Sequence, residues 1–272
     1  MVNMAILAAI YLKWKTQRSL QAIYKILASL ALSRFLCLLS VLFYYIIVVF
    51  YPSILLGTDF GAAMVVEIMF LHFTNFWFAT VLCVFYCAKI TSYSNICCIF
   101  LKMKISRSVS WFLLASLLIS LTSALPFGFG VFSLESKNFL NGTMENATIN
   151  NFVPVTNFQR QLLIFLIGSC PPFLIFCVTI CLLLHSLWMH TRRMRSSGSN
   201  FRCPNLETHF SAVKSMSLFL VLHIIYFVFL NVFLSGRLFY HTVSEWVIPI
   251  LSCPPLFLHS LYIIFSNSDL KK

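Results

Sequence analysis

Charged residues are scarce in this chain. Of its 272 residues, 10% are charged and 60% are hydrophobic, and only seven are acidic. Soluble domains carry roughly a quarter charged residues, so this balance excludes an ordinary soluble domain. The formal net charge is +12, but long apolar stretches separate the basic residues. They therefore form no continuous patch of the kind that nucleic acid needs, and nucleic acid is not an expected partner.

Catalytic patterns are missing as well. The sequence has no His-Glu-x-x-His motif, no Gly-x-Ser-x-Gly motif, no phosphate-binding glycine-rich loop and no pair of carboxylates inside an apolar run. Its seven histidines are scattered singly, and its ten cysteines lack the regular spacing of a disulfide scaffold. We predict that the protein is not an enzyme and that it needs no cofactor and no metal.

Long apolar runs are what the sequence does contain. A membrane-spanning helix needs roughly 20 mostly apolar residues, and six segments meet that test. They cover residues 22–50, 63–90, 109–131, 161–188, 213–234 and 246–265. Helices are expected because lipid cannot satisfy an open backbone, and the runs are too long and unalternating for barrel strands.

The start of the chain differs from these six runs. Residues 2–12 are apolar but cover about half of the length that a span requires. We interpret them as the inner part of a first helix whose outer half is missing. The predicted fold is therefore all-α, a polytopic membrane seven-helix bundle with six complete spans and a partial first helix. Residues 1–272 form this single domain.

Basic residues predict the orientation of the bundle, because loops rich in Lys and Arg stay in the cytoplasm. Most of the 19 Lys and Arg residues flank alternate ends of the spans, and Lys271 and Lys272 end the chain on that same side. Two glycosylation sequons, at Asn141 and Asn146, fall on the opposite side. We predict a multi-pass protein of the plasma membrane with the N-terminus outside and the C-terminus cytoplasmic.

Ionisable residues inside spans are costly, so each requires a reason. Arg34 lies midway along its span, and we expect it to be a structural anchor that bonds to carbonyls or to a polar side chain of a neighbouring helix. Glu67 lies near the outer end of its span, where a ligand cavity and simple interfacial solvation both explain it.

An ordered series of motifs resembles the bitter taste receptor family, the taste receptor type 2 class of G-protein-coupled receptors. The segments that are similar to family motifs are Leu30-Ala31-Leu32-Ser33-Arg34, Trp77-Phe78-Ala79-Thr80, Phe85-Tyr86-Cys87-Ala88-Lys89-Ile90, Pro172-Phe173, Ser186-Leu187, His190-Thr191-Arg192-Arg193-Met194 and His259-Ser260. The spacing of Pro204, His209, Ala212 and Lys214 is also similar to that of the family, as is the spacing of Asn3 and Trp14.

The resemblance implies a pocket that opens outward among helices three, five, six and seven and binds small, often bitter organic molecules. The residues implied to bind ligand are Glu67, Ile68, His72, Asn75, Tyr226 and Glu245. Ile68 and His72 replace a tryptophan and an asparagine that are frequent in the family, so ligand preference cannot be inherited from a relative.

The resemblance also implies that the inner face engages a gustducin-like heterotrimeric G protein. The residues implied to face it are Lys89, Arg192, Arg193, His209 and Lys214. Asn3, Arg34, Trp77, Tyr86 and Pro172 are implied to have structural roles. The expected partners are thus small-molecule agonists, the G protein and the lipid bilayer, with receptor oligomers a further class.

Other functions remain as alternatives at this stage. A vomeronasal type 1-like receptor shares the general architecture, although the Phe-Tyr-x-x-Lys-Ile and His-x-x-Ala-x-Lys motifs favour the taste family. A small membrane transporter is a second alternative, but the halves of the chain show no convincing self-similarity. A nonfunctional remnant is a third, because half of the first helix is expected to be absent.

Overall fold

The computed structural model describes residues 2–17, 21–51, 54, 59–90, 107–128 and 155–196. It also describes residues 214, 217–218, 220–222, 224–225, 228, 258 and 260–261. Its helices are α1 (Val2–Gln17), α2 (Ala22–Phe50), α4 (Asp59–Ile90) and α6 (Val155–Ser196), together with a helix at Arg107–Gly128. Within these described residues the regular structure is helical throughout.

Four of the predicted spans coincide with helices that are long and apolar enough to cross a membrane. These stretches are Ala22–Phe50, Asp59–Lys89, Arg107–Gly128 and Leu162–Ser186. The runs at 213–234 and 246–265 lie largely outside the described residues, as do residues 129–131. The fold class predicted from composition, an all-α membrane protein, is confirmed.

Three helices are longer than their apolar runs. α1 continues past residue 12 to Gln17, with Lys15 in its last turn, where a positive charge interacts favourably with the helix dipole. α4 begins at Asp59 instead of residue 63, and the carboxylate in its first turn is favourable for the same reason. α6 extends from Val155 to Ser196, because hydrogen bonding within a helix does not stop where the apolar run ends.

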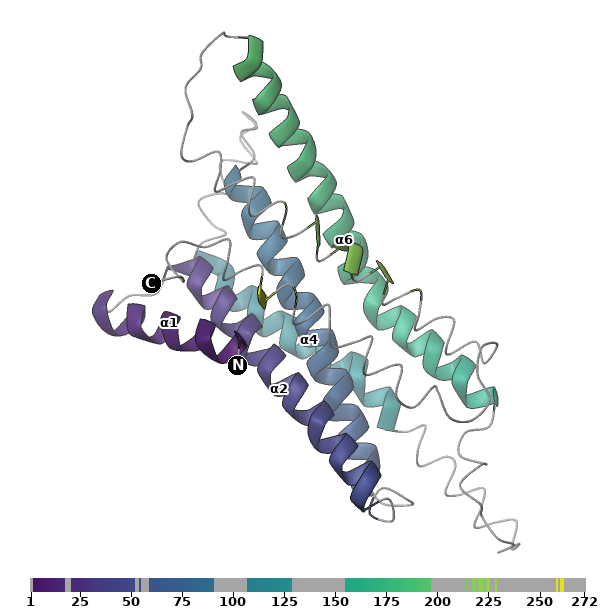
Figure 1. Ribbon diagram of the computed structural model, residues 1–272. Coiled ribbons are helices and arrows are strands. Elements are labelled where there is room, and N and C mark those ends of the chain that lie inside the picture. Colours follow the sequence, from purple (N-terminus) through teal and green to yellow (C-terminus); the bar gives the residue numbers. More distant parts are fainter. Residues whose placement is uncertain are drawn as a thin grey trace, which may run out of the picture.

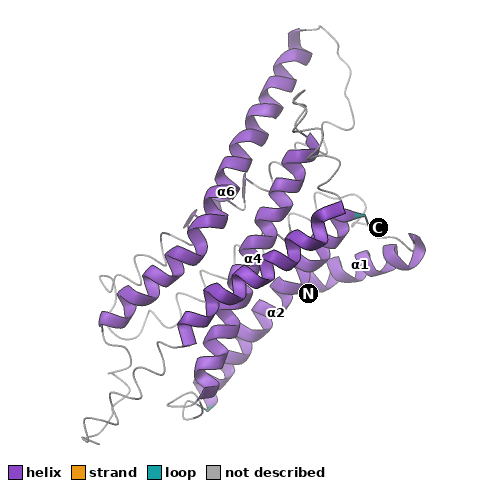
Figure 2. Cartoon of the chain, turned by 180° about the vertical axis from the view of Figure 1, so that it is seen from behind, coloured by secondary structure: helices purple, strands orange, loops and turns teal. Residues whose placement is uncertain are grey.

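The helices α2, α4, Arg107–Gly128 and α6 run lengthwise in alternating directions, whereas α1 lies at an angle to them (Figures 1 and 2). We call the end at which α2 begins and α4 ends the basic end, because it carries the exposed residues Lys25 and Lys89. Arg107 and Arg192 are also exposed at this end, where the Arg107–Gly128 helix begins and α6 ends. The described acidic residues, Asp59 and Glu67, lie toward the opposite end of α4.

α4 is the central helix of the described bundle. It packs against α2 on one side and α6 on the other. In the most apolar stretch of each helix, 61% of α4 is buried, compared with 39% of α2 and 22% of Arg107–Gly128. α4 therefore has the least surface left for lipid. One core cluster, which includes Leu30, Phe85 and Phe176, joins α1, α2, α4 and α6. A second cluster, which includes Phe73 and Phe165, lies toward the opposite end.

Polar contacts join α2 to its neighbours inside the apolar bundle. Arg34 is only 1% exposed, and its Nη1 donates a hydrogen bond to Ser260 Oγ at 2.9 Å. This is the kind of contact that the sequence analysis expects for Arg34, because a guanidinium in hydrocarbon requires acceptors. Beside it, Ser33 Oγ lies 2.7 Å from Asn75 Oδ1 of α4. α2 is thereby connected both to the central helix and to the segment that contains Ser260.

Close contact between α4 and α6 depends on a glycine. A Cβ atom added at Gly168 would lie 2.8 Å from Phe73 Cζ and 3.2 Å from Ser123 Cβ. Phe73 is completely buried, so its ring has little room to move away. Gly168 therefore permits the approach of the two helices, as small residues do at helix interfaces in membranes.

A double-mutant cycle tests the bond between Arg34 and Ser260. Ser260→Ala should lower thermal stability in the wild-type background, because it removes an acceptor from a buried cation. In an Arg34→Met background the same change should have almost no effect, which gives a coupling energy of about 0.6–1.7 kcal/mol. Thermal unfolding of the purified receptor in detergent measures it, and purely additive effects would contradict the contact.

Gly168→Ala tests the close approach of α4 and α6. The added methyl group overpacks the core against Phe73, and we expect a loss of about 1–3 kcal/mol in unfolding free energy. Phe73→Leu in the same chain should restore part of that loss by removing the clashing ring atoms. Ile167→Ala, at an adjacent position that is 73% exposed, is the matched control. Equal losses for Gly168→Ala and Ile167→Ala would show that the contact is not tight.

Candidate functional site

Three of the residues predicted to bind ligand share one face of α4. Ile68, His72 and Asn75 follow one another at spacings of four and three residues, which places them on the same side of a helix. Ile68 and His72 are half-buried, and Asn75 is 2% exposed. Because α4 packs between α2 and α6, this face contacts both neighbours. We call Ile68, His72 and Asn75 the α4 face.

His72 is surrounded by aromatic rings. Its ring centroid lies 5.7 Å from that of Phe165 on α6 and 6.1 Å from that of Phe73 on its own helix. Phe165 and Phe73 are in turn 5.8 Å apart. Offset and tilted rings at these separations attract one another and also accept a further flat ring. This part of the site therefore offers an apolar wall with one polar side chain in it.

Asn75 provides a polar group at the buried end of the same face. Ser33 Oγ is 2.7 Å from Asn75 Oδ1 and 3.0 Å from the carbonyl oxygen of Leu30, and its single proton can serve only one of them at a time. The Nδ2 group of Asn75 is buried and has no hydrogen-bond partner among the described residues. Buried donors are rarely left unmatched, so this amide is suited to a polar atom of a ligand or a water molecule.

Glu67 lies beside the α4 face and toward the end opposite the basic end. Its side chain is exposed, and Ser40 Oγ of α2 donates a hydrogen bond to Glu67 Oε1 at 2.8 Å. An exposed carboxylate with a serine partner is compatible with both explanations given by the sequence, a ligand cavity and simple solvation. The remaining predicted ligand-binding residues, Tyr226 and Glu245, lie outside the described residues.

Exposed cations at the basic end are held by aromatic rings. Lys89 Nζ lies 5.2 Å from the ring centroid of Phe85, and the guanidinium of Arg192 lies 5.5 Å from that of Trp188. Lys214 is also exposed and helical. Cation–π contacts of this kind position a charge at a helix end while leaving it accessible. Of the other residues predicted to face a G protein, His209 lies outside the described residues, and the side chain of Arg193 does too.

The residues with predicted structural roles are mostly inside the bundle. Asn3 is 5% exposed, Arg34 is 1% exposed, Pro172 is buried, and Trp77 and Tyr86 are half-buried. The carbonyl of Pro172 accepts a hydrogen bond from Thr80 Oγ1 at 3.3 Å, which links α4 to α6. The sequons Asn141 and Asn146 lie outside the described residues.

Sequence reasoning missed several members of the site. Phe165 belongs to an apolar run with many similar residues, so nothing marked it as a neighbour of His72. Ser40 is a single hydroxyl in a span, and its contact with Glu67 depends on the register between α2 and α4.

The described helices contain no group of three or more His, Cys, Asp or Glu residues arranged to hold a metal ion.

Comparisons with known proteins agree with the motif series. The model of the family described as taste receptor protein (TAS2R) matches residues 1–272. Taste receptor type 2 member 39 of Mus musculus is 30% identical over 275 residues, covering 98% of this chain and 83% of that protein. Taste receptor type 2 member 1 of Chlorocebus aethiops is 33% identical over 254 residues, covering 91% and 80%. Taste receptor type 2 member 2 of Homo sapiens is 29% identical over 255 residues, covering 94% and 83%.

These matches extend along the whole described bundle, and they include the helices that carry the α4 face and the basic end. They favour the taste family over the vomeronasal and transporter alternatives. The chain belongs to the taste receptor type 2 family, and it is therefore a chemosensory membrane receptor with a seven-helix fold, not an enzyme.

Proposed function

We propose that this receptor binds small, bitter organic molecules from outside the cell and in response activates a gustducin-like heterotrimeric G protein. The observation that carries the ligand half of the proposal is the α4 face, where the unmatched amide of Asn75 and the aromatic surroundings of His72 lie on one side of the central helix. The chain is a multi-pass protein of the plasma membrane in this proposal, with its N-terminus outside, its C-terminus in the cytoplasm and sugars at Asn141 and Asn146.

The chemistry of this face favours broad recognition. Aromatic and aliphatic side chains provide most of its contact area, and they discriminate among ligands mainly by shape and dispersion. Asn75 and His72 add a small number of polar contacts that orient a bound molecule. Tyr226 and Glu245 complete the proposed site, with Glu67 and Ile68 nearer its opening. Such a site binds many compounds weakly in preference to one compound tightly.

The basic end supports the transducer half of the proposal. Lys89 and Arg192 present exposed positive charges there, and the proposed orientation places them in the cytoplasm together with Arg193, His209 and the exposed Lys214. Clustered cations attract an acidic protein surface and speed its association. They also suit the anionic headgroups of the cytoplasmic leaflet.

A functional assay tests the proposal as a whole. Cells that express the chain with a promiscuous G protein should give calcium responses to several members of a panel of bitter compounds, and cells without it should not. Surface biotinylation confirms that the protein reaches the plasma membrane. Silence toward the entire panel, with surface protein present, would contradict the proposal.

Alanine substitutions at the α4 face test the ligand site. His72→Ala and Asn75→Ala each remove a polar contact, so the concentration for half-maximal response should rise by about tenfold for at least some agonists. Concentration–response curves at matched surface expression measure this change. Leu174→Ala, at a position of α6 that is 61% exposed, is the control and should leave the curves unchanged. Unaltered potency of every agonist in both variants would place the site elsewhere.

Substitutions at the basic end test the transducer surface. Arg192→Ala and Lys214→Ala should reduce the maximal G-protein response several-fold while ligand affinity stays the same, because the proposed transducer surface is at the basic end, about 20 Å along α4 from Asn75. Lys15→Ala removes an exposed cation from the end of α1 and serves as the control. An equal loss in Lys15→Ala would indicate a general charge effect, not a specific surface.

A further inference from the structure

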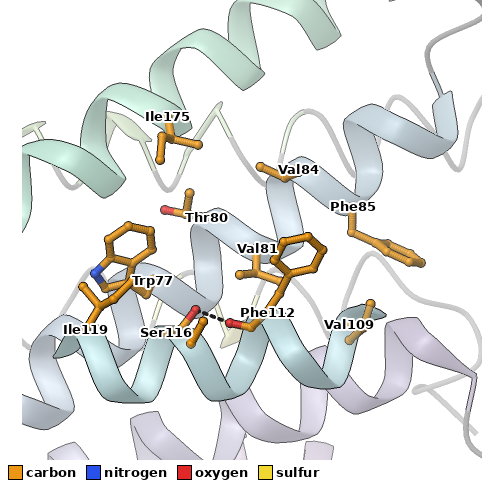
Figure 3. A pocket seen from close by; sticks show the side chains of 11 residues that line it. Trp77, Thr80, Val81, Val84, Phe85, Val109, Phe112, Ser116, Ile119 and Ile175 are labelled. Carbon is orange, nitrogen blue, oxygen red and sulfur yellow. Dashed lines mark hydrogen bonds between the residues drawn. The ribbon is translucent and has the colours of Figure 1, made fainter. Parts of the chain in front are cut away.

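A separate cavity lies between α4, the Arg107–Gly128 helix and α6 (Figure 3). Its volume is about 250 Å³, and its lining includes Trp77, Val84, Phe85, Phe112 and Ile175. The cavity shares no lining residue with the α4 face or with Glu67. It is therefore distinct from the proposed site for bitter compounds.

The lining of this cavity is almost entirely apolar, and its one unpaired polar group among the described residues is the buried indole Nε1 of Trp77. Ser116 Oγ donates to the carbonyl oxygen of Phe112 at 2.7 Å, within its own helix. Thr80 Oγ1 lies 2.9 Å from the carbonyl oxygen of Phe76 and 3.3 Å from that of Pro172. Cavities lined by aliphatic and aromatic side chains stay dry, and one of roughly 150 Å³ binds benzene. The larger cavity of this receptor is suited to a hydrocarbon segment longer than one ring.

The cavity is accessible from the side of the bundle. Three of its lining residues are well exposed: Phe112 at 46%, Ile119 at 42% and Ile175 at 42%. All three belong to membrane-spanning stretches, so their exposed surfaces face the lipid. An occupant can therefore enter from the bilayer, where hydrocarbon chains are present at high concentration.

One end of the cavity lies toward the basic end, where two cations are exposed. Phe85 and Val109 lie at the end opposite Trp77 and Ile119, as Figure 3 shows. Lys89 follows Phe85 by one helical turn, and its Nζ lies 5.2 Å from that ring centroid. Arg107 precedes Val109 by two residues, so the two lie about 3 Å apart along the axis at the same end of the helix. Because residues two apart do not share a face, only the long side chain of Arg107 can bring its charge toward this end of the cavity.

Both cations are exposed, and the structure places no described acidic residue near them. Asp59 and Glu67 lie toward the other end of α4. The charged end of the cavity thus has a net positive charge beside an apolar chamber. A molecule with an anionic head and a hydrocarbon tail matches both parts, and the cytoplasmic leaflet is rich in such lipids.

We propose that this cavity binds one acyl chain of an anionic phospholipid, whose net negative headgroup is attracted by Lys89 and Arg107. The occupant fills the space between α4 and α6 next to the bond from Thr80 to the carbonyl of Pro172, and it stiffens the packing of these helices. The proposal does not depend on the identity of the agonist or of the G protein.

Photolabelling of the purified receptor in lipid nanodiscs tests this proposal. The probes are phosphatidylserine and phosphatidylcholine that carry the same diazirine in the middle of one acyl chain. Mass spectrometry then identifies the labelled peptides. We expect phosphatidylserine to label the Arg107–Gly128 helix and the second half of α4 at least about fivefold more strongly than phosphatidylcholine, since each of the two nearby cations contributes about a fivefold preference. Equal labelling by the two lipids would overturn the proposal without the use of any variant.

Substitutions separate the two parts of the site. Lys89→Gln and Arg107→Gln should each lower labelling by phosphatidylserine about fivefold and leave labelling by phosphatidylcholine unchanged. Ala115→Trp fills the cavity and should remove labelling by both lipids. The matched controls are Lys15→Gln, an exposed cation of α1, and Leu118→Trp, at a position 58% exposed that does not line the cavity. Labelling that persists in Ala115→Trp, or that falls equally in the controls, would contradict the site.

Discussion

Arg34 lies in the middle of α2 with 1% of its surface exposed, and it donates to Ser260 of the segment that follows the last predicted loop. A guanidinium in a hydrocarbon environment has no water to solvate it, so the surrounding helices have to provide its acceptors. The neighbouring residue, Ser33, bonds to Asn75 on the central helix. These two adjacent side chains determine which face of α2 turns inward and which helices it contacts.

The position of α4 follows from this arrangement and organises the rest of the receptor. α2 occupies one side of α4, and α6 occupies the other, where Gly168 allows the backbone to approach Phe73. The side-chain amide of Asn75 therefore contacts α2 through its oxygen, while its Nδ2 group is available to a ligand in the proposed site.

The sequence predicts much of the fold, because hydrocarbon thickness and backbone satisfaction impose the length of a span. The bounds 22–50 agree with those of α2, and a polar partner for Arg34 was expected from the cost of burying its charge. The span predicted at 161–188 agrees with Leu162–Ser186, whereas the continuation of α6 to Val155 and Ser196 could not be predicted, since polar turns beyond an apolar run carry no length signal.

Contacts that depend on the register between helices could not be predicted. The approach of Phe165 to His72, the bond from Ser40 to Glu67 and the cavity beside Phe112 all require knowledge of how one helix rotates against another. Hydrophobicity in a membrane helix is nearly the same on every side, so a single sequence does not specify that rotation. The family motifs predict which residues matter, whereas the packing determines what they touch.

In the proposed function this chain converts the binding of a small molecule into G-protein activation. Its most direct test is nucleotide exchange by a purified gustducin-like G protein mixed with the purified receptor in nanodiscs. A bitter agonist should accelerate GTP uptake, and His72→Ala should shift this acceleration to higher agonist concentration. Exchange at the basal rate at every agonist concentration, by a receptor shown to be folded and to bind the agonist, would contradict the proposed function.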